Sequence, residues 1–214
     1  CIIVELSANT YSIFGRLYTG DSNEKFVDYH TRQNEQVDTL QAYDTSEFYR
    51  IEQTANYGTG TNRLTAFYSE NMAYNYYGIS QYSSSHDAFV SKFISSLGYS
   101  DSVNITIYNE PILSSDSLLG IKYILSDFDV PGCEKVTDLG QFNQKNTYFN
   151  PNALNIGFQV SSDVLNSISG ENPFEYQNLI FSKMLGKDVQ IYKKAENNLK
   201  LEDQKASYSF SPVS

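Results

Sequence analysis

The run Ile121-Lys122-Tyr123-Ile124-Leu125 constrains the fold more than any other part of this sequence. A largely apolar run of this length suits the central strand of a sheet. The preceding residues 114–120 are typical of a capped helical turn, and Pro131-Gly132 turns the chain afterwards. The sequence therefore predicts a sheet with residues 121–125 inside it.

Three segments carry the spacing and the end signals of helices. Residues 23–43 follow Asp21-Ser22, a good capping pair, and place apolar side chains at near-helical intervals. Residues 88–98 form an apolar stripe with a polar cap before it and a glycine at its end. A third helix is predicted from Asn172-Pro173, since Asn caps and Pro suits the first helical position, and it ends before Gly186.

Short strands and turns account for most of the remaining sequence. Residues 48–52 alternate large apolar and charged side chains, which is the pattern of a half-buried strand. Further strands are predicted at 104–108, 135–139, 146–149, 156–160 and 189–192. Because the strands come in hairpin-like groups among helices, we expect an α+β fold with a mixed, largely antiparallel sheet and about three to four helices packed on it.

The chain shows no repeat and no clear linker, so residues 21–194 are predicted to form a single domain. Residues 1–20 begin abruptly on an apolar run and are interpreted as the remnant of a membrane-flanking segment, followed by a loop with Gly15 and Gly20. No apolar run reaches the roughly 18 residues that a membrane-spanning helix needs. Residues 195–214 are polar and aperiodic, which indicates a tail or an incomplete strand.

The net charge of -10 argues against two classes of partner. Nucleic-acid binding draws its affinity from clustered Lys and Arg, and this sequence has no such cluster. An anionic lipid surface would also repel a chain of this charge. We therefore predict no nucleic-acid partner.

The cysteines and histidines predict no metal or cofactor. Cys1 and Cys133 form neither a disulfide framework nor a zinc spacing, and they pair only if the fold brings them together. His30 and His86 lie far apart and lack an i, i+4 partner. Walker, Rossmann and G-x-S-x-G motifs are absent from the sequence, so we predict no catalytic residue in this chain.

Residues 74–85, Tyr-Asn-Tyr-Tyr-Gly-Ile-Ser-Gln-Tyr-Ser-Ser-Ser, hold the densest set of aromatic and hydroxyl groups in the chain. Tyrosine offers a flat apolar body with a hydrogen-bonding tip, which suits sugars and half-apolar protein surfaces. The alternative is a tyrosine-rich strand and turn that packs for structural reasons, since strands favour aromatic residues. Both interpretations stay open at this point.

Five segments, taken in order, resemble a known family. They are residues 48–52 (FYRIE), 77–84 (YGISQYSS), 116–125 (DSLLGIKYIL), 150–158 (NPxALxxGF) and 172–178 (NPFExQN). Together they look like the large extracytoplasmic region of bacterial YfhO-type membrane proteins, over roughly residues 23–193. One departure is Leu154-Asn155-Ile156, where related sequences often have Leu-Pro.

The resemblance implies a multi-spanning membrane protein of Gram-positive bacteria, similar to glycosyltransferases that decorate lipoteichoic acid or related cell-envelope polymers. Such enzymes use a polyprenyl-phosphate sugar outside the membrane. Their catalytic carboxylate lies in early loops that this chain lacks, so no catalytic residue is carried over. The implied location is the extracytoplasmic side of the cell membrane, with the rest of the membrane-embedded protein as a partner.

Two functional hypotheses follow. In the first, the domain helps to position an acceptor polymer or glycan, and its candidate contacts are Arg50, Tyr74, Asn75, Tyr77, Ser80 and Tyr82. In the second, the domain is structural or binds another protein, and the same residues pack internally. An independent hydrolase is a third, weaker hypothesis, because paired carboxylates cannot be located in space from sequence alone.

Overall fold

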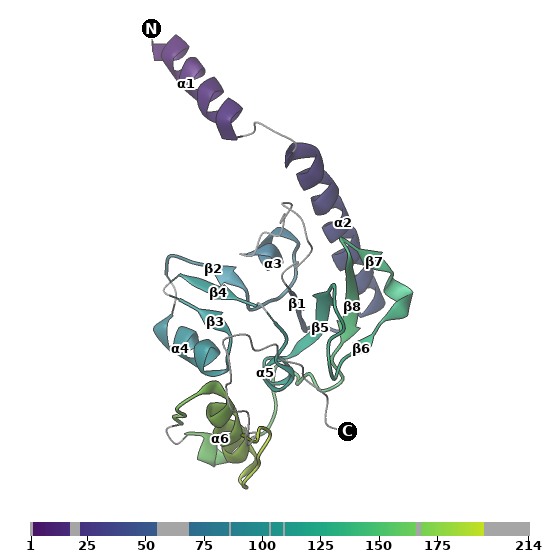
Figure 1. Cartoon of the computed structure of the whole chain (residues 1–214), viewed down its shortest axis with the longest axis vertical. Coiled ribbons are helices and arrows are strands. Elements are labelled where there is room, and N and C mark those ends of the chain that lie inside the picture. The colour runs from purple at the N-terminus through teal and green to yellow at the C-terminus, as the bar shows by residue number, and fades with distance from the viewer. Residues whose placement is uncertain are drawn as a thin grey trace, which may run out of the picture.

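The computed structural model describes residues 2–17, 22–54, 69–85, 87–102, 104–108, 110–165 and 168–194. Two sheets lie side by side with helices around them, and a long N-terminal arm leads into the larger one (Figure 1). The predicted α+β class, with mixed and mostly antiparallel pairing, is confirmed.

The larger sheet has the predicted strand β5 inside it. Its strands are β1 (Arg50–Gln53), β5 (Ile121–Ser126), β6 (Glu134–Lys135), β7 (Gln141–Phe142) and β8 (Lys145–Phe149). They run in the order β1-β5-β8-β6, with β7 also paired to β8. β5 is parallel to β1 and antiparallel to β8. Every residue of β5 except Lys122 is buried, because this strand is covered on both faces.

The smaller sheet is antiparallel and carries the end of the tyrosine-rich stretch. It consists of β2 (Gln81–Tyr82), β3 (Ser100–Asp101) and β4 (Ile105–Ile107), in the order β2-β4-β3. Helix α4 (Ala88–Ser96) lies beside β3 (Figure 1). Its first turn is capped by the Asp87 carboxylate, which accepts from the amides of Phe89 and Val90.

The predicted helices are confirmed, and α4 and α6 have their predicted start signals, whereas Asp21, the predicted cap of the long helix, lies outside the described residues. The long helix is α2 (Ser22–Tyr43), and the third predicted helix is α6 (Pro173–Leu185). The Asn172 side chain caps α6, and Gly186 ends it at φ 62°, where a side chain would be strained. Two shorter helices are α3 (Glu70–Ala73) and α5 (Leu113–Leu118), and single 3₁₀ turns span Thr137–Leu139 and Ser162–Leu165.

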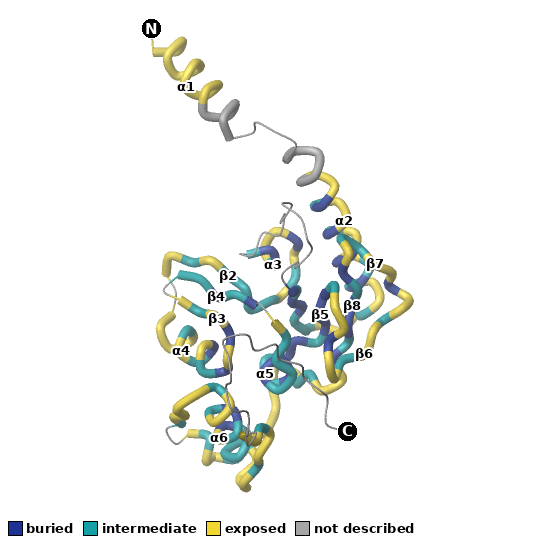
Figure 2. Tube along the Cα trace, in the orientation of Figure 1, coloured by how far each residue is buried: buried dark blue, intermediate teal, exposed yellow. Residues whose placement is uncertain are grey.

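The first residues differ from the prediction. Helix α1 (Ile2–Leu17) runs through Gly15, which was expected in a loop, whereas Gly20 lies outside the described residues. Figure 2 shows the described surface of α1 exposed, while buried residues concentrate on β5, β8 and the side of α2 that faces them. In the described part of the chain, no helix has both the length and the apolar character needed to cross a membrane.

Two predicted strands do not form, and a third is cut short. Residues 189–192 bind side chains of α6 instead of a neighbouring strand: Ser182 accepts from the Val189 amide at 2.9 Å, and Asn178 accepts from the Ile191 amide at 2.8 Å. Residues 156–160 are exposed, begin with a bend and form no strand with the described residues. The segment 135–139 becomes β6 followed by a 3₁₀ turn, which buries Leu139. The polar tail from residue 195 lies outside the described residues.

Candidate functional site

The tyrosine-rich stretch is fastened to the larger sheet by the carboxylate of Glu52, a buried residue of β1. The Ser80 amide donates to Glu52 Oε1 at 2.9 Å and the Ser80 hydroxyl to Oε2 at 3.0 Å, while the Ile79 amide also donates to Oε1. Next to these contacts, the Ile51 amide donates to the Tyr77 carbonyl at 2.8 Å. β1 therefore sets the position of residues 77–80.

Glycine is required where this stretch passes the carboxylate. A Cβ placed on Gly78 would lie 2.8 Å from Glu52 Oε1 and 3.2 Å from the Ile51 carbonyl oxygen. The first distance is too short for a Cβ, and Oε1 cannot move aside without breaking its bonds to the Ile79 and Ser80 amides, so the close approach depends on glycine at this position.

Burial has a clear electrostatic effect on Glu52. Loss of solvent raises the pKa of this carboxyl to about 7, even though the hydrogen bonds from Ser80 and Ile79 favour the charged form. Glu52 is therefore a carboxyl group that holds a loop in place and titrates near neutral pH.

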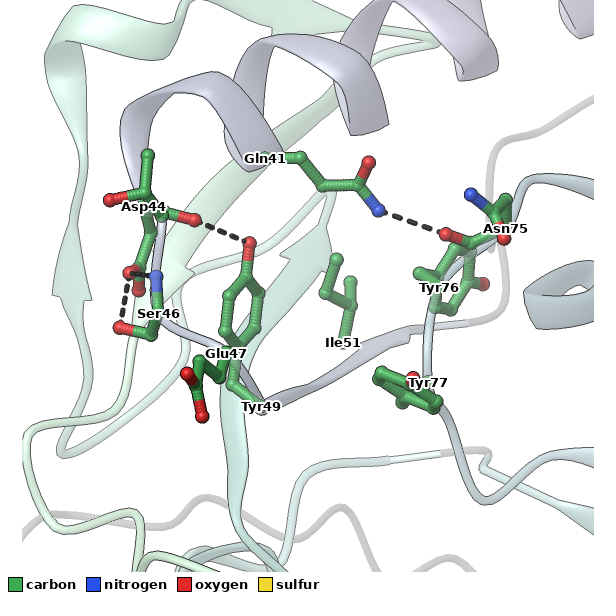
Figure 3. A pocket seen from close by; sticks show the side chains of 10 residues that line it. Gln41, Asp44, Ser46, Glu47, Tyr49, Ile51, Asn75, Tyr76 and Tyr77 are labelled. Atoms are coloured by element: carbon green, nitrogen blue, oxygen red, sulfur yellow. Dashed lines mark hydrogen bonds between the residues drawn. The ribbon is translucent and has the colours of Figure 1, made fainter.

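A pocket of about 330 Å³ opens between the end of α2, the approach to β1 and the start of the tyrosine-rich stretch (Figure 3). Its lining residues are Gln41, Asp44, Thr45, Ser46, Glu47, Tyr49, Ile51, Asn75, Tyr76 and Tyr77. A neighbouring hollow of about 490 Å³ shares Gln41, Asn75, Tyr76 and Tyr77 with it. We refer to the first of these as the tyrosine pocket.

Aromatic side chains form much of the wall of the tyrosine pocket. Ile51 lies between Tyr49 and Tyr76 in the close view (Figure 3). Tyr77 is 59% exposed and packs on Phe48 with ring centroids 4.8 Å apart. Rings that are supported from behind and open in front present flat apolar faces to a ligand.

Several polar groups at the pocket have hydrogen-bonding capacity to spare. Gln41 Nε2 donates to the Asn75 carbonyl at 2.9 Å, which joins α2 to the stretch (Figure 3). In the part of the chain that the structure describes, the Gln41 side-chain oxygen, the Asn75 amide side chain, the Glu47 carboxylate and the Tyr77 hydroxyl have no intramolecular partner. These groups can bind a polar ligand without breaking an existing bond.

Asp44 stiffens the other side of the pocket. Its carboxylate contacts the Lys122 ammonium at 2.5 Å and accepts from the Tyr123 hydroxyl at 2.9 Å and the Ser46 amide at 3.0 Å. Partial burial opposes ionisation, but the hydrogen bonds from Lys122, Ser46 and Tyr123 outweigh it and lower the pKa of Asp44 to about 2. Lys122 also lies 5.3 Å from the centre of the Tyr49 ring.

Three of the six predicted contact residues are at the surface, and two of them meet at the pocket. Asn75 and Tyr77 line it, and Asn75 takes the left-handed conformation at φ 54°, which Asn tolerates better than most residues. Tyr82 is 57% exposed but belongs to β2 of the smaller sheet and does not line this pocket.

The other three predicted contacts have internal partners. Tyr74 is buried, with its ring edge-on to Tyr29 at 6.5 Å. Ser80 binds Glu52, as described above. The Arg50 guanidinium donates to the Leu119 carbonyl and lies 5.1 Å from the Phe48 ring.

Sequence reasoning missed the half of the pocket that lies before β1. Gln41, Asp44, Glu47 and Tyr49 are at least 25 residues from the tyrosine-rich stretch in sequence, and only the fold brings them to it. A local signal was present in Asp44-Thr45-Ser46, since an Asp that accepts from the amide two residues on is typical of the turn that ends a helix.

A second buried carboxylate, Asp116, belongs to the core. It accepts from the hydroxyls of Tyr99 at 2.6 Å and Tyr108 at 3.1 Å, and from the Ile112 amide at 3.0 Å. Burial raises its pKa to about 7 despite these donors. Asp116 thus connects α5 to Tyr99 and Tyr108, which flank the strands β3 and β4.

The described residues contain no group of three or more His, Cys, Asp or Glu side chains that could hold a metal ion. Cys133 is a free thiol, and burial raises its pKa to about 11. Cys1 and His86 lie outside the described residues, so their predicted roles stay predictions.

Comparison with curated proteins and with solved structures gave no match. A family model described as bacterial membrane protein YfhO matches residues 1–210, which is almost the entire sequence. The five segments that resemble this family include the strand with Glu52, the stretch that wraps it and the segment with Asp116. This chain belongs to the YfhO family of bacterial membrane proteins.

Proposed function

We propose that this chain is an extracytoplasmic domain of its YfhO-family protein and that the tyrosine pocket holds a glycan of a cell-envelope acceptor polymer. The transfer of a sugar from a polyprenyl-phosphate donor would take place in another part of the same protein. The role of the domain is then to position the acceptor.

The observation that carries this proposal is the composition of the tyrosine pocket. Tyr49, Tyr76 and Tyr77 supply aromatic surface, and Gln41 and Asn75 supply amide groups beside it. A sugar ring has an apolar face that packs on an aromatic ring and a rim of hydroxyls that bind amides and carboxylates. The pocket offers both kinds of contact within one sugar-sized space.

Two buried carboxyls with raised pKa values, Glu52 and Asp116, have structural partners and lie outside the tyrosine pocket. Glu52 is bound to backbone amides of the tyrosine-rich stretch, and Asp116 is bound to two buried tyrosines. Both groups are almost completely buried, so they stabilise the fold and do not contact the pocket.

A titration of the 214-residue chain with glycosylated teichoic-acid fragments, followed by amide chemical shifts, tests the proposal. We expect shifts at Gln41, Asn75 and Tyr77 and about a fivefold loss of affinity in Tyr77→Ala, since one aromatic contact contributes on the order of 1 kcal/mol. Tyr82→Ala is the matched control, because Tyr82 is equally exposed and lies on the other sheet. Equal losses in both variants, or no shifts at all, would reject the proposal.

A second candidate function, protein interaction, rests on exposed apolar side chains away from the pocket. Phe89 on α4 is 86% exposed and Phe174 on α6 is 60% exposed. Exposed apolar side chains mark a protein interface where they join into a contiguous patch. Binding of another part of the parent protein that is lost in Phe89→Ser and unaffected by Tyr77→Ala would favour this function.

A further inference from the structure

We infer that the tyrosine pocket accepts an uncharged sugar unit and discriminates against a phosphate-bearing one. This inference rests on the proposed glycan-binding function and specifies the chemical class of the ligand. If the acceptor is a polymer with a phosphate backbone, the pocket contacts its neutral sugar substituents and leaves the phosphates outside.

The charges at the pocket carry the first step of the argument. Among its ten described lining residues, Asp44 and Glu47 are acidic and none is Lys or Arg. Phosphate sites in proteins are built from the opposite set, namely guanidinium groups, ammonium groups or clustered backbone amides. A phosphate in this pocket would meet carboxylates and would have no cation in the lining to pair with.

Two cations outside the lining, Lys122 and Arg50, have partners of their own. Lys122 contacts the Asp44 carboxylate at 2.5 Å and the Ser46 hydroxyl at 3.1 Å, so its charge compensates Asp44. Arg50 donates to the Leu119 carbonyl and packs over Phe48. Within the described residues no cation forms an ion pair with Glu47, so the lining carries one carboxylate without a cationic partner.

The polar groups that line the tyrosine pocket favour a neutral polyol. Sugar hydroxyls can donate to the Glu47 carboxylate in charge-assisted hydrogen bonds, which are stronger than neutral ones. The Gln41 oxygen and the Asn75 amide can complete a neutral donor and acceptor set beside the exposed Tyr77 ring. The net charge of -10 over the whole chain further repels a polyanion at low salt.

The test compares methyl glycosides of glucose, galactose and N-acetylglucosamine with their 6-phosphates. Binding to the 214-residue chain is followed by amide chemical shifts at pH 7.5 in low salt. We expect at least one neutral glycoside to bind at the pocket. Its 6-phosphate should bind with an affinity that is lower by about tenfold or more. The difference should shrink at 0.5 M salt, because the repulsion is screened.

Glu47→Gln provides the decisive variant, since Glu47 is exposed and its replacement does not disturb the core. We expect this variant to reduce severalfold the ratio of the affinity for the neutral sugar to the affinity for its 6-phosphate. Glu134→Gln is the matched control, because it changes the net charge equally from an exposed position on β6 outside the pocket. Glu134→Gln should have an affinity ratio close to that of the unchanged chain.

The outcomes separate the inference from the function on which it rests. Equal binding of the neutral and phosphorylated sugars at the pocket would overturn the inference and leave glycan binding intact. An equal effect of Glu47→Gln and Glu134→Gln would also overturn it, because the discrimination would then come from the overall charge. Absence of binding by every neutral glycoside and by the glycosylated polymer would reject both.

Discussion

Ser80 binds Glu52 through both its amide and its hydroxyl, at 2.9 and 3.0 Å, although the two residues are 28 positions apart. This pair joins the tyrosine-rich stretch to β1. The Ser80 hydroxyl also accepts from the Tyr108 amide at 3.1 Å, so the same side chain reaches the end of the smaller sheet. One serine thus connects the two sheets at the point where the stretch passes between them.

Replacing Glu52 by Ala should lower the free energy of unfolding by about 3 kcal/mol. The change leaves the amides of Ile79 and Ser80 buried without an acceptor and opens a cavity. Urea denaturation followed by tyrosine fluorescence measures the effect. Glu47→Ala is the control, since this exposed carboxylate should matter by less than about 0.5 kcal/mol. Similar losses in the two variants would contradict the structural role of Glu52.

Stability should fall as the pH rises from about 4.5 to about 7. The pKa values of Glu52 and Asp116 are raised to about 7 in the folded chain, so between their ordinary values and pH 7 the folded state binds more protons than the unfolded state. Each carboxyl then removes up to about 1.4 kcal/mol of stability per pH unit in this window. Denaturation midpoints at pH 5 and pH 7.5 test the direction, and Glu52→Gln should make the dependence flatter. A midpoint that rises over this range would contradict the prediction.

Asp44 has the opposite dependence on pH. Its folded pKa is lowered to about 2, so its contribution is present above pH 4 and is lost as the pH falls toward 2. Asp44→Ala should cost about 1 kcal/mol at pH 7, because it breaks the contact with Lys122 and leaves the Tyr123 hydroxyl without this acceptor. Thermal denaturation at pH 7 and pH 2.5 tests this prediction. The difference in melting temperature between Asp44→Ala and the unchanged chain should be smaller at the lower pH.

Gly78→Ala should destabilise the fold by roughly 1–3 kcal/mol. The added methyl group would collide with Glu52 Oε1, which two backbone amides hold in place, and would press on the Ile51 carbonyl oxygen of β1. Gly157→Ala is the matched control, since a Cβ there meets no atom within 4 Å. Melting temperatures of the two variants provide the comparison, and an equal effect would mean that the approach at Gly78 is not tight.

The helices of this fold were predictable because their signals are local. Asp87, Asn172 and Gly186 mark helix ends in the sequence, and each has the expected geometry. Strands were less predictable, because a strand needs a partner that the local pattern does not identify. Residues 189–192 alternate as a strand would, yet their amides bind Asn178 and Ser182.

The candidate site could be predicted in part for the same reason. The tyrosines of residues 74–85 could be recognised because they are close together in the sequence. Whether each ring is buried or exposed depends on α3 and on the left-handed conformation of Asn75 after it. That turn leaves Tyr74 buried and Tyr77 exposed. Asp44 and Tyr49 reach the pocket only through the packing of α2 and β1, which no local pattern expresses.

The bond from the Ile51 amide to the Tyr77 carbonyl has a consequence for self-association. β1 is the outer strand of the larger sheet, and an uncovered outer strand is a template on which another chain can add a strand. The bridge between Arg50 and Tyr77 occupies this edge and ends regular pairing after one contact. The tyrosine-rich stretch thereby blocks the addition of another strand along the first residues of β1, whether or not a ligand is bound.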